Sequence, residues 1–224
     1  MIDAGGHALF YGLAAAASPL ALTATFVAIR SARPRTNGMA FLSGFVLGTA
    51  IASGLGLLLG QAAVERLDSH ETLEAVLALL LGIVLLTVGL RERLESPGPP
   101  EGSRASAILA GLGNVRPAAA FSMAGLLGFG GPKRLVLTFL AMASVSEAIL
   151  GDAASGTLVV FYIAVATVLV WVPVGIVIVA GERAAVILER GQSWLTAHAA
   201  ALRVWLSVGI GAALVVDGLA RLLA

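Results

Sequence analysis

Three long stretches without a single charged residue constrain this fold more than any other feature. Residues 4–29, 36–64 and 153–181 contain no Asp, Glu, Lys or Arg, and each is longer than the ~20 residues with which a helix crosses a bilayer. Lipid offers the backbone no hydrogen-bond partners, so a spanning segment must be a helix or part of a closed barrel. The runs lack the polar–apolar alternation of barrel strands. The sequence therefore predicts an all-α integral membrane protein.

The pattern of charges and prolines predicts six transmembrane helices in two halves. The linker at 91–104 holds three of the eight prolines. It separates a first three-helix unit (1–90) from a second (105–224), and we expect an interfacial helix at about 182–203. The expected spans are 7–29, 38–60, 74–90, 117–150, 157–180 and 204–222.

Short sequence matches indicate that the two units are inverted repeats. LGIVLLTVGL (81–90) matches IGAALVVDGL (210–219), and SPLALTATFVA (18–28) matches GPKRLVLTFLA (131–141). A three-span unit must return with inverted topology, and inverted repeats with broken helices are common in transporters. We therefore expect two inverted three-helix repeats in which the first and fourth helices are broken.

The arginines predict the orientation in the membrane. Three lie in each of the segments 30–35, 91–104 and 182–203, and only Arg66 and Arg221 would face the other side. The remaining cations, Arg116, Lys133 and Arg134, are not assigned to a side. Arginine is enriched on the cytoplasmic side. We therefore expect a multi-pass protein of the inner membrane with both termini outside the cytoplasm.

Small residues recur every four positions in the second span. This ridge consists of Gly44, Gly48, Ala52, Gly56 and Gly60. Such a ridge lets another helix approach closely, either within the chain or in a homodimer. A lipid or substrate groove is the alternative use.

The sequence carries none of the motifs of common enzymes or of metal sites. There is no P-loop, HExxH or GxSxG motif, there are no cysteines, and the three histidines are far apart. No Lys/Arg cluster suggests a nucleic-acid partner. We expect neither enzymatic activity nor a cofactor or metal.

Two prolines are expected to break helices inside the membrane. Proline removes a backbone hydrogen bond, so Ser18 becomes a candidate N-cap and Pro19 the first residue of a new half-helix. By the repeat match, Gly131 and Pro132 start a second half-helix, with Lys133 and Arg134 in its first turn. These six residues are the candidate substrate site. A half-helix start donates N–H groups to an anion, although the two cations could instead be a cytoplasmic topology signal.

Two acids are candidates for an ion pair with those cations or for proton coupling. Glu147 follows Lys133 and Arg134 on the same predicted helix, and Asp217 falls near the end of the last span. Ionisable residues within spans are costly and usually functional. Each acid could instead lie at the outer interface.

Several of these elements together resemble a known family. The order is the Ser18-Pro19 break, an arginine-rich loop leading into NGMAFLSGFVLG (37–48), the Pro132-Lys133 element and a terminal GxxLxxxGL-type helix. The chain resembles the actinobacterial Sap/GAP family of sulfolipid- and glycopeptidolipid-addressing proteins, a branch of the lysine exporter (LysE) superfamily. In that family the element is closer to Asn-Pro-Lys, so Gly131 departs from it, whereas Pro132 and Lys133 match.

The resemblance implies export of envelope lipids. We expect an inner-membrane transporter, or transport accessory, for polar-headed or anionic (glyco)lipids, working beside a large lipid transporter or synthase complex. A LysE-type proton-coupled exporter of small solutes is one alternative. The other is a membrane scaffold for lipid-synthesis machinery that transports nothing.

Overall fold

A computed structural model describes residues 2–64, 116–148 and 151–184, together with scattered positions at 79, 83, 186–187, 190–191, 208–209, 211–212 and 215–216. Within these ranges the chain forms helices and no strands, which confirms the all-α prediction for this part of the protein. The helices are α1 (Ile2–Ala16), α2 (Pro19–Ile29), α3 (Pro34–Val64), α6 (Pro117–Phe129), α7 (Pro132–Glu147), α8 (Asp152–Ala166) and α9 (Val168–Ala180), followed by the 3₁₀ turn η1 (Gly181–Arg183).

The helices differ in how they would cross a membrane. In the described part of the chain, only the segment Pro34–Leu58 of α3 is long and apolar enough by itself. Three further pairs qualify if each bent pair counts as one span: α1 with α2, bent by 65°, α6 with α7, bent by 63°, and α8 with α9, bent by 70°. The expected spans at 74–90 and 204–222 lie almost entirely outside the described residues, so the six-span arrangement and the inverted repeat stay predictions.

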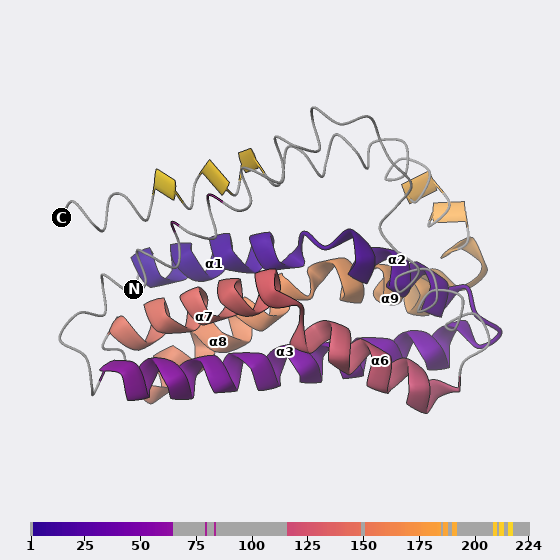
Figure 1. The fold of residues 1–224 in the computed structure, drawn as a ribbon. Coiled ribbons are helices and arrows are strands. Elements are labelled where there is room, and N and C mark those ends of the chain that lie inside the picture. The colour runs from indigo at the N-terminus through magenta and orange to yellow at the C-terminus, as the bar shows by residue number, and fades with distance from the viewer. Residues whose placement is uncertain are drawn as a thin grey trace.

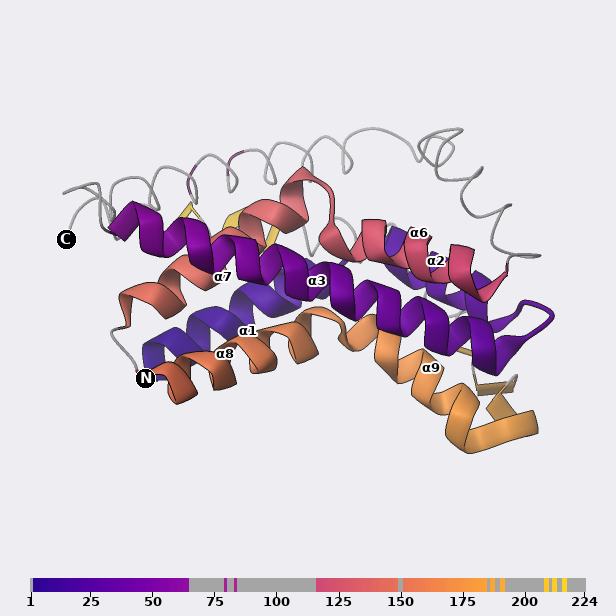
Figure 2. The same cartoon turned by 90° about the horizontal axis from the view of Figure 1, so that it is seen from below.

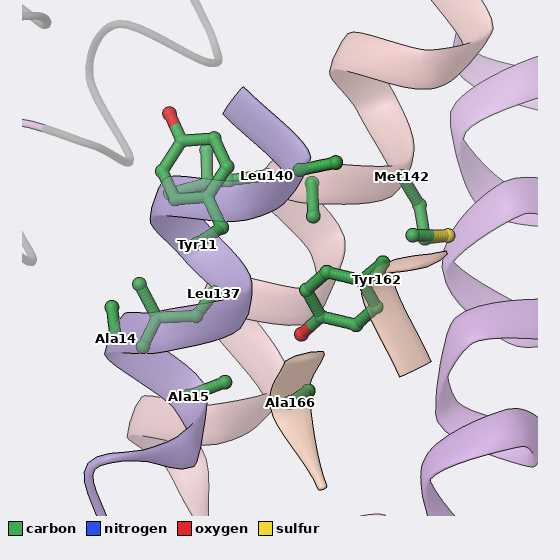
Figure 3. Packing of buried hydrophobic residues seen from close by; sticks show 10 residues of the cluster. Tyr11, Ala14, Ala15, Leu137, Leu140, Met142, Tyr162 and Ala166 are labelled. Carbon is green, nitrogen blue, oxygen red and sulfur yellow. The ribbon is translucent and has the colours of Figure 1, made fainter. Parts of the chain in front are cut away.

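The bends divide the helices into two groups. We call α1, α7 and α8 the first lobe and α2, α6 and α9 the second lobe (Figure 1). The core of the first lobe is built around the fully buried Tyr11, Leu137, Met142 and Tyr162 (Figure 3). The second lobe has separate apolar clusters, built around Phe41, Phe45 and Val170 and around Phe26 and Val174.

Helix α3 is the one described helix that runs unbroken along both lobes (Figure 2). Its small residues meet the backbone of α6: a Cβ added at Gly44 would lie 2.1 Å from the carbonyl oxygen of Phe121, and one at Gly48 2.1 Å from that of Gly125. Farther along, a Cβ at Gly56 would lie 3.0 Å from Cγ of Met142 in α7. The ridge therefore serves packing within the chain at Gly44, Gly48 and Gly56, and the homodimer stays a prediction.

The structure also corrects the expected fifth span. Residues 157–180 were expected to form one helix, but the chain turns by 70° at Thr167. Val170 N–H bonds to the Thr167 carbonyl instead of continuing the α-helical ladder to Ala166, and the Thr167 hydroxyl bonds to the carbonyl of Ile163. Pro173 lies inside α9 rather than at the break.

Candidate functional site

Each of the three breaks frees a backbone carbonyl inside the molecule. In a continuous helix the carbonyl of residue i accepts from the N–H of residue i+4. Pro19 and Pro132 have no N–H, so the carbonyls of Ala15 and Gly128 lose these partners. At the third break, Val170 N–H has turned to Thr167, which leaves the carbonyl of Ala166. A carbonyl buried without a partner costs about 1–3 kcal/mol, so the fold must supply other donors.

Arg134 supplies them. Its side chain is only 8% exposed. Nη1 donates to the Ala15 carbonyl at 3.1 Å and Nη2 to the Ala166 carbonyl at 3.1 Å. Nη2 also donates to Thr49 Oγ1 at 3.1 Å, and the guanidinium carbon lies 4.6 Å from the centre of the Phe45 ring, a distance typical of cation–π contacts. One arginine therefore joins the ends of α1 and α8 to the middle of α3.

Thr49 completes the junction at the third freed carbonyl. Its hydroxyl lies 3.3 Å from the Gly128 carbonyl and 2.9 Å from the Phe45 carbonyl in its own helix, and it accepts from Arg134. At each of the three breaks, one released carbonyl is thus bound by Arg134 or Thr49. We call this group, Arg134 and Thr49 with the carbonyls of Ala15, Gly128 and Ala166, the junction.

A short buried polar chain continues from the junction into the first lobe. Thr138 donates its hydroxyl to the Arg134 carbonyl at 2.8 Å, and its oxygen also lies 2.8 Å from the Tyr162 hydroxyl oxygen, at hydrogen-bond distance. Figure 3 shows Tyr162 among the apolar side chains of the first lobe, near Ala166. Arg134 Nε is buried and has no hydrogen-bond partner among the described atoms.

Helix dipoles explain why a charge is tolerated at this depth. A cation in the first turn of its own helix opposes the dipole by roughly 0.3–1 kcal/mol. The guanidinium, however, lies against the C-terminal ends of both α1 and α8, and each such end carries about −0.5 charge. Together these two ends offset the charge of Arg134 without any bound anion.

Gly130 makes room for this side chain. Its φ is +101°, and an added Cβ would lie 2.9 Å from both Cβ and Cδ of Arg134. Any residue with a side chain would therefore be strained by backbone conformation and would also contact the arginine. The sequence shows a glycine at position 130 but not the arginine contact that requires it.

The other predicted site residues lie at the starts of α2 and α7. Ser18 caps α2 by accepting from Ala21 N–H at 3.4 Å, with Pro19 at the first position of that helix, and Gly131 and Pro132 begin α7 in the same manner, without a side-chain cap. The expected breaks at Pro19 and Pro132 are therefore present, whereas their place as the first and fourth of six spans stays a prediction. Lys133 follows in the first turn of α7, one residue before Arg134.

The two acids are not brought to Arg134 by the described part of the chain. Glu147 is the last residue of α7, about 20 Å along the helix axis from Arg134 at 1.5 Å per residue. Asp217 lies outside the described residues. No group of acidic or histidine side chains suited to a metal occurs among the residues described.

Comparison with known proteins then identifies the family. The sequence profile described as "Sap, sulfolipid-1-addressing protein" matches residues 9–220. The chain belongs to the Sap family. No curated protein and no solved structure matches it. The match covers all three breaks and the junction, so the junction lies within the part of the chain that the Sap family shares. Membership of the LysE superfamily stays a prediction.

Proposed function

We propose that this protein acts in the inner membrane as a transporter, or transport accessory, for the export of polar-headed or anionic envelope lipids. The observation that carries the proposal is the Sap family match over residues 9–220, because the family description names the addressing of a sulfolipid. The apolar helices suit a membrane location.

The broken helices support a role in transport. Helices that are interrupted at mid-membrane are a common way to build transporter sites, because they expose backbone groups where a substrate can reach them. Ionisable residues at such depth are generally functional. Here the breaks meet at Arg134, and Lys133 lies beside it in sequence, at the start of α7. We assign binding of the anionic headgroup to Lys133 and the half-helix start at Gly131 and Pro132, with Ser18 and Pro19 at the matching start of α2, while Arg134 organises the breaks.

The distribution of charge supports the proposed orientation. In the ranges 2–64, 116–148 and 151–184, one end of the helices carries Glu182 and five arginines, whereas the opposite end carries three acids and no cation. The arginines are Arg30, Arg33, Arg35, Arg116 and Arg183, and the acids are Asp3, Glu147 and Asp152. Under the positive-inside rule the arginine end is cytoplasmic, which puts the N-terminus outside.

Labelling of single cysteines tests this orientation, since the chain has none of its own. Thr36 and Ala153 are exposed at opposite ends. In intact cells, Ala153→Cys should react with a membrane-impermeant maleimide, whereas Thr36→Cys should react only after the cells are permeabilised. The reverse pattern would overturn the orientation.

Lipid analysis of the outer envelope tests the function itself. We expect a deletion strain to lose one class of polar or anionic lipid from its surface and to retain that lipid inside. Lys133→Ala should fail to restore export at normal expression, and Lys133→Arg should restore part of it, because the positive charge is kept but the compact ammonium is not. Arg183→Ala, at an exposed arginine, is the matched control and should restore export fully.

The same experiment separates the alternatives. A scaffold for lipid synthesis would lower the total amount of the lipid instead of trapping it inside. A proton-coupled solute exporter using Glu147 or Asp217 would leave the lipids unchanged. Full export by Lys133→Ala would show that this cation does not bind substrate.

A further inference from the structure

The three breaks and the junction lie in a single layer between the two lobes (Figures 1 and 2). α1 joins α2, α7 joins α6, and α8 joins α9 across this layer, each at a bend of 63–70°. Among the described residues, the largest buried side chains of the first lobe, such as Tyr11, Leu137 and Tyr162, belong to a cluster separate from those of the second lobe. In the described part of the chain, the apolar cores of the two lobes are therefore distinct clusters.

Helix α3 is bound unequally by the two lobes. On the second lobe its backbone touches that of α6, because Gly44 and Gly48 lie against α6 carbonyls and a Cβ at Gly128 of α6 would lie 2.1 Å from the Phe45 carbonyl. On the first lobe the closest atoms to a Cβ at Gly56 belong to the side chain of Met142, at 3.0 Å, and the backbone carbonyl of Thr138 is farther away, at 3.7 Å. Backbone contact resists displacement because nothing can rotate away, whereas a methionine side chain adapts. α3 therefore belongs with the second lobe.

Arg134 contacts both sides of this division. It belongs to α7 of the first lobe, and it binds the ends of two other first-lobe helices through Ala15 and Ala166. On the other side of the division it contacts α3, through Thr49 Oγ1 and the Phe45 ring. Thr49 is also the only side chain that binds the Gly128 carbonyl among the described residues. The polar link across the layer is thus the Arg134–Thr49 bond with the Phe45 contact, beside the packing of α3 on α7, and Arg134 Nε is not used in it.

We propose that the junction is an intramembrane hinge: α1, α7 and α8 pivot as one body against α2, α3, α6 and α9, and the Arg134–Thr49 bond holds the conformation seen here. Bonds within each body persist during the movement. The bond between Arg134 and Thr49, with the contact to Phe45, breaks and reforms. A bistable element of this kind can be biased by any ligand that binds one conformation better, so the hinge does not depend on the lipid proposed above.

Distances between spin labels test the hinge without any substrate. The cysteine-free chain takes label pairs at exposed positions, and Val160 on α8 and Leu126 on α6 are 67% and 76% exposed. This pair measures across the layer. Leu126 with Val179 of α9, and Leu13 of α1 with Val160, measure within the second and the first body. The protein would be reconstituted in nanodiscs of phosphatidylethanolamine and phosphatidylglycerol.

Thr49→Val is the decisive variant, because valine keeps the shape of threonine and removes only the hydroxyl. We expect the cross-layer pair to gain a second, separate distance population in Thr49→Val and a larger one in Arg134→Gln. Both within-body pairs should keep their wild-type distances. Ser53→Ala on the same helix, which loses only a bond to the Thr49 carbonyl, is the matched control and should resemble wild type.

Two results would overturn the hinge. An unchanged cross-layer distance in both variants would show that the junction does not govern a movement. Broadening of the within-body pairs together with the cross-layer pair would show that Arg134 and Thr49 support the whole fold and not a hinge. Loss of lipid export in the deletion strain affects neither readout, so the two proposals fail separately.

Discussion

The proline breaks at Pro19 and Pro132 bend the chain by nearly the same angle, 65° and 63°, yet they are built differently. Each proline starts a helix and frees the carbonyl four residues earlier. In α2 the N-cap is Ser18 and the third helical position is Ala21, and the two bond to each other. In α7 the corresponding residues are Gly131 and Arg134, and the arginine reaches out of its own helix to the ends of α1 and α8.

The same local effect of proline, a helix start and a freed carbonyl, thus leads to two different roles in the fold. The first break is capped by its own Ser18, and its freed Ala15 carbonyl is bound by Arg134 from another helix. The second break carries Arg134, which donates hydrogen bonds to a freed carbonyl at each of the other two breaks. Substitutions at the second break should therefore disturb the whole layer, whereas those at the first should remain local.

Removing the arginine should have the largest effect. Arg134→Ala leaves the Ala15 and Ala166 carbonyls buried without donors, at about 1–3 kcal/mol each, while it also removes the cost of burying a charge. We expect a net loss of about 2–4 kcal/mol in the free energy of unfolding. Unfolding in detergent micelles, followed by tryptophan fluorescence, measures it.

Arg183→Ala is the control for that experiment. Arg183 is exposed at the far end of α9, and surface substitutions usually change stability by less than about 0.5 kcal/mol. Equal midpoints for the two variants would mean that the junction contributes nothing to stability, and the contrast between the two breaks would fail.

The adjacent glycines of the second break should differ from each other. Gly130→Ala puts a side chain at φ +101° and against Arg134, so we expect a loss of about 1–3 kcal/mol. Gly131 has φ −83° and no atom within 4 Å of an added Cβ. Gly131→Ala should therefore be neutral or stabilise by up to about 1 kcal/mol, because it restricts the unfolded chain.

Circular dichroism melting curves in micelles compare this pair directly. The two variants add the same methyl group at neighbouring positions, so they are each other's control. A loss at Gly131 as large as that at Gly130 would show that the break tolerates no side chain at all, and that the space for Arg134 is not the reason for the glycine.

The sequence predicted the breaks better than it predicted what joins them. Pro19 and Pro132 act through a missing N–H, which is a property of the residue itself, so both half-helix starts and the Ser18 cap could be foreseen. The third break at Thr167 carries no proline of its own. Pro173 lies six residues later, inside α9, and was the one available signal near it.

The junction could not be foreseen because its contacts join distant segments. Arg134 meets Ala15, Thr49 and Ala166, which are 119, 85 and 32 residues away in sequence. A backbone carbonyl carries no sequence signature, and a threonine in an apolar run looks like any other. The spacing of the α3 glycines predicted close packing, but only the fold shows that the partners are α6 and α7.

The smallest effect is expected at the first break. Ser18→Ala removes the acceptor of Ala21 N–H, a long bond of 3.4 Å, and loss of an N-cap typically costs about 1 kcal/mol. Ser18→Gly should cost only a few tenths of a kcal/mol, roughly as glycine caps do elsewhere, and it makes the first break resemble the second. Urea-assisted thermal unfolding in micelles has the precision to rank these variants.

Ser122→Ala serves as the matched control, because Ser122 is exposed on α6 and its hydroxyl bonds only to the Ala118 carbonyl one turn before. Its stability should equal that of the wild type. If Ser18→Ala lost as much as Arg134→Ala, the first break would support the whole layer as the second does, because a local cap cannot account for a loss of that size. We expect the loss of stability to fall from Arg134→Ala to Gly130→Ala to Ser18→Ala. This order follows if the first break is capped by its own Ser18 and the second break supports the other two through Arg134.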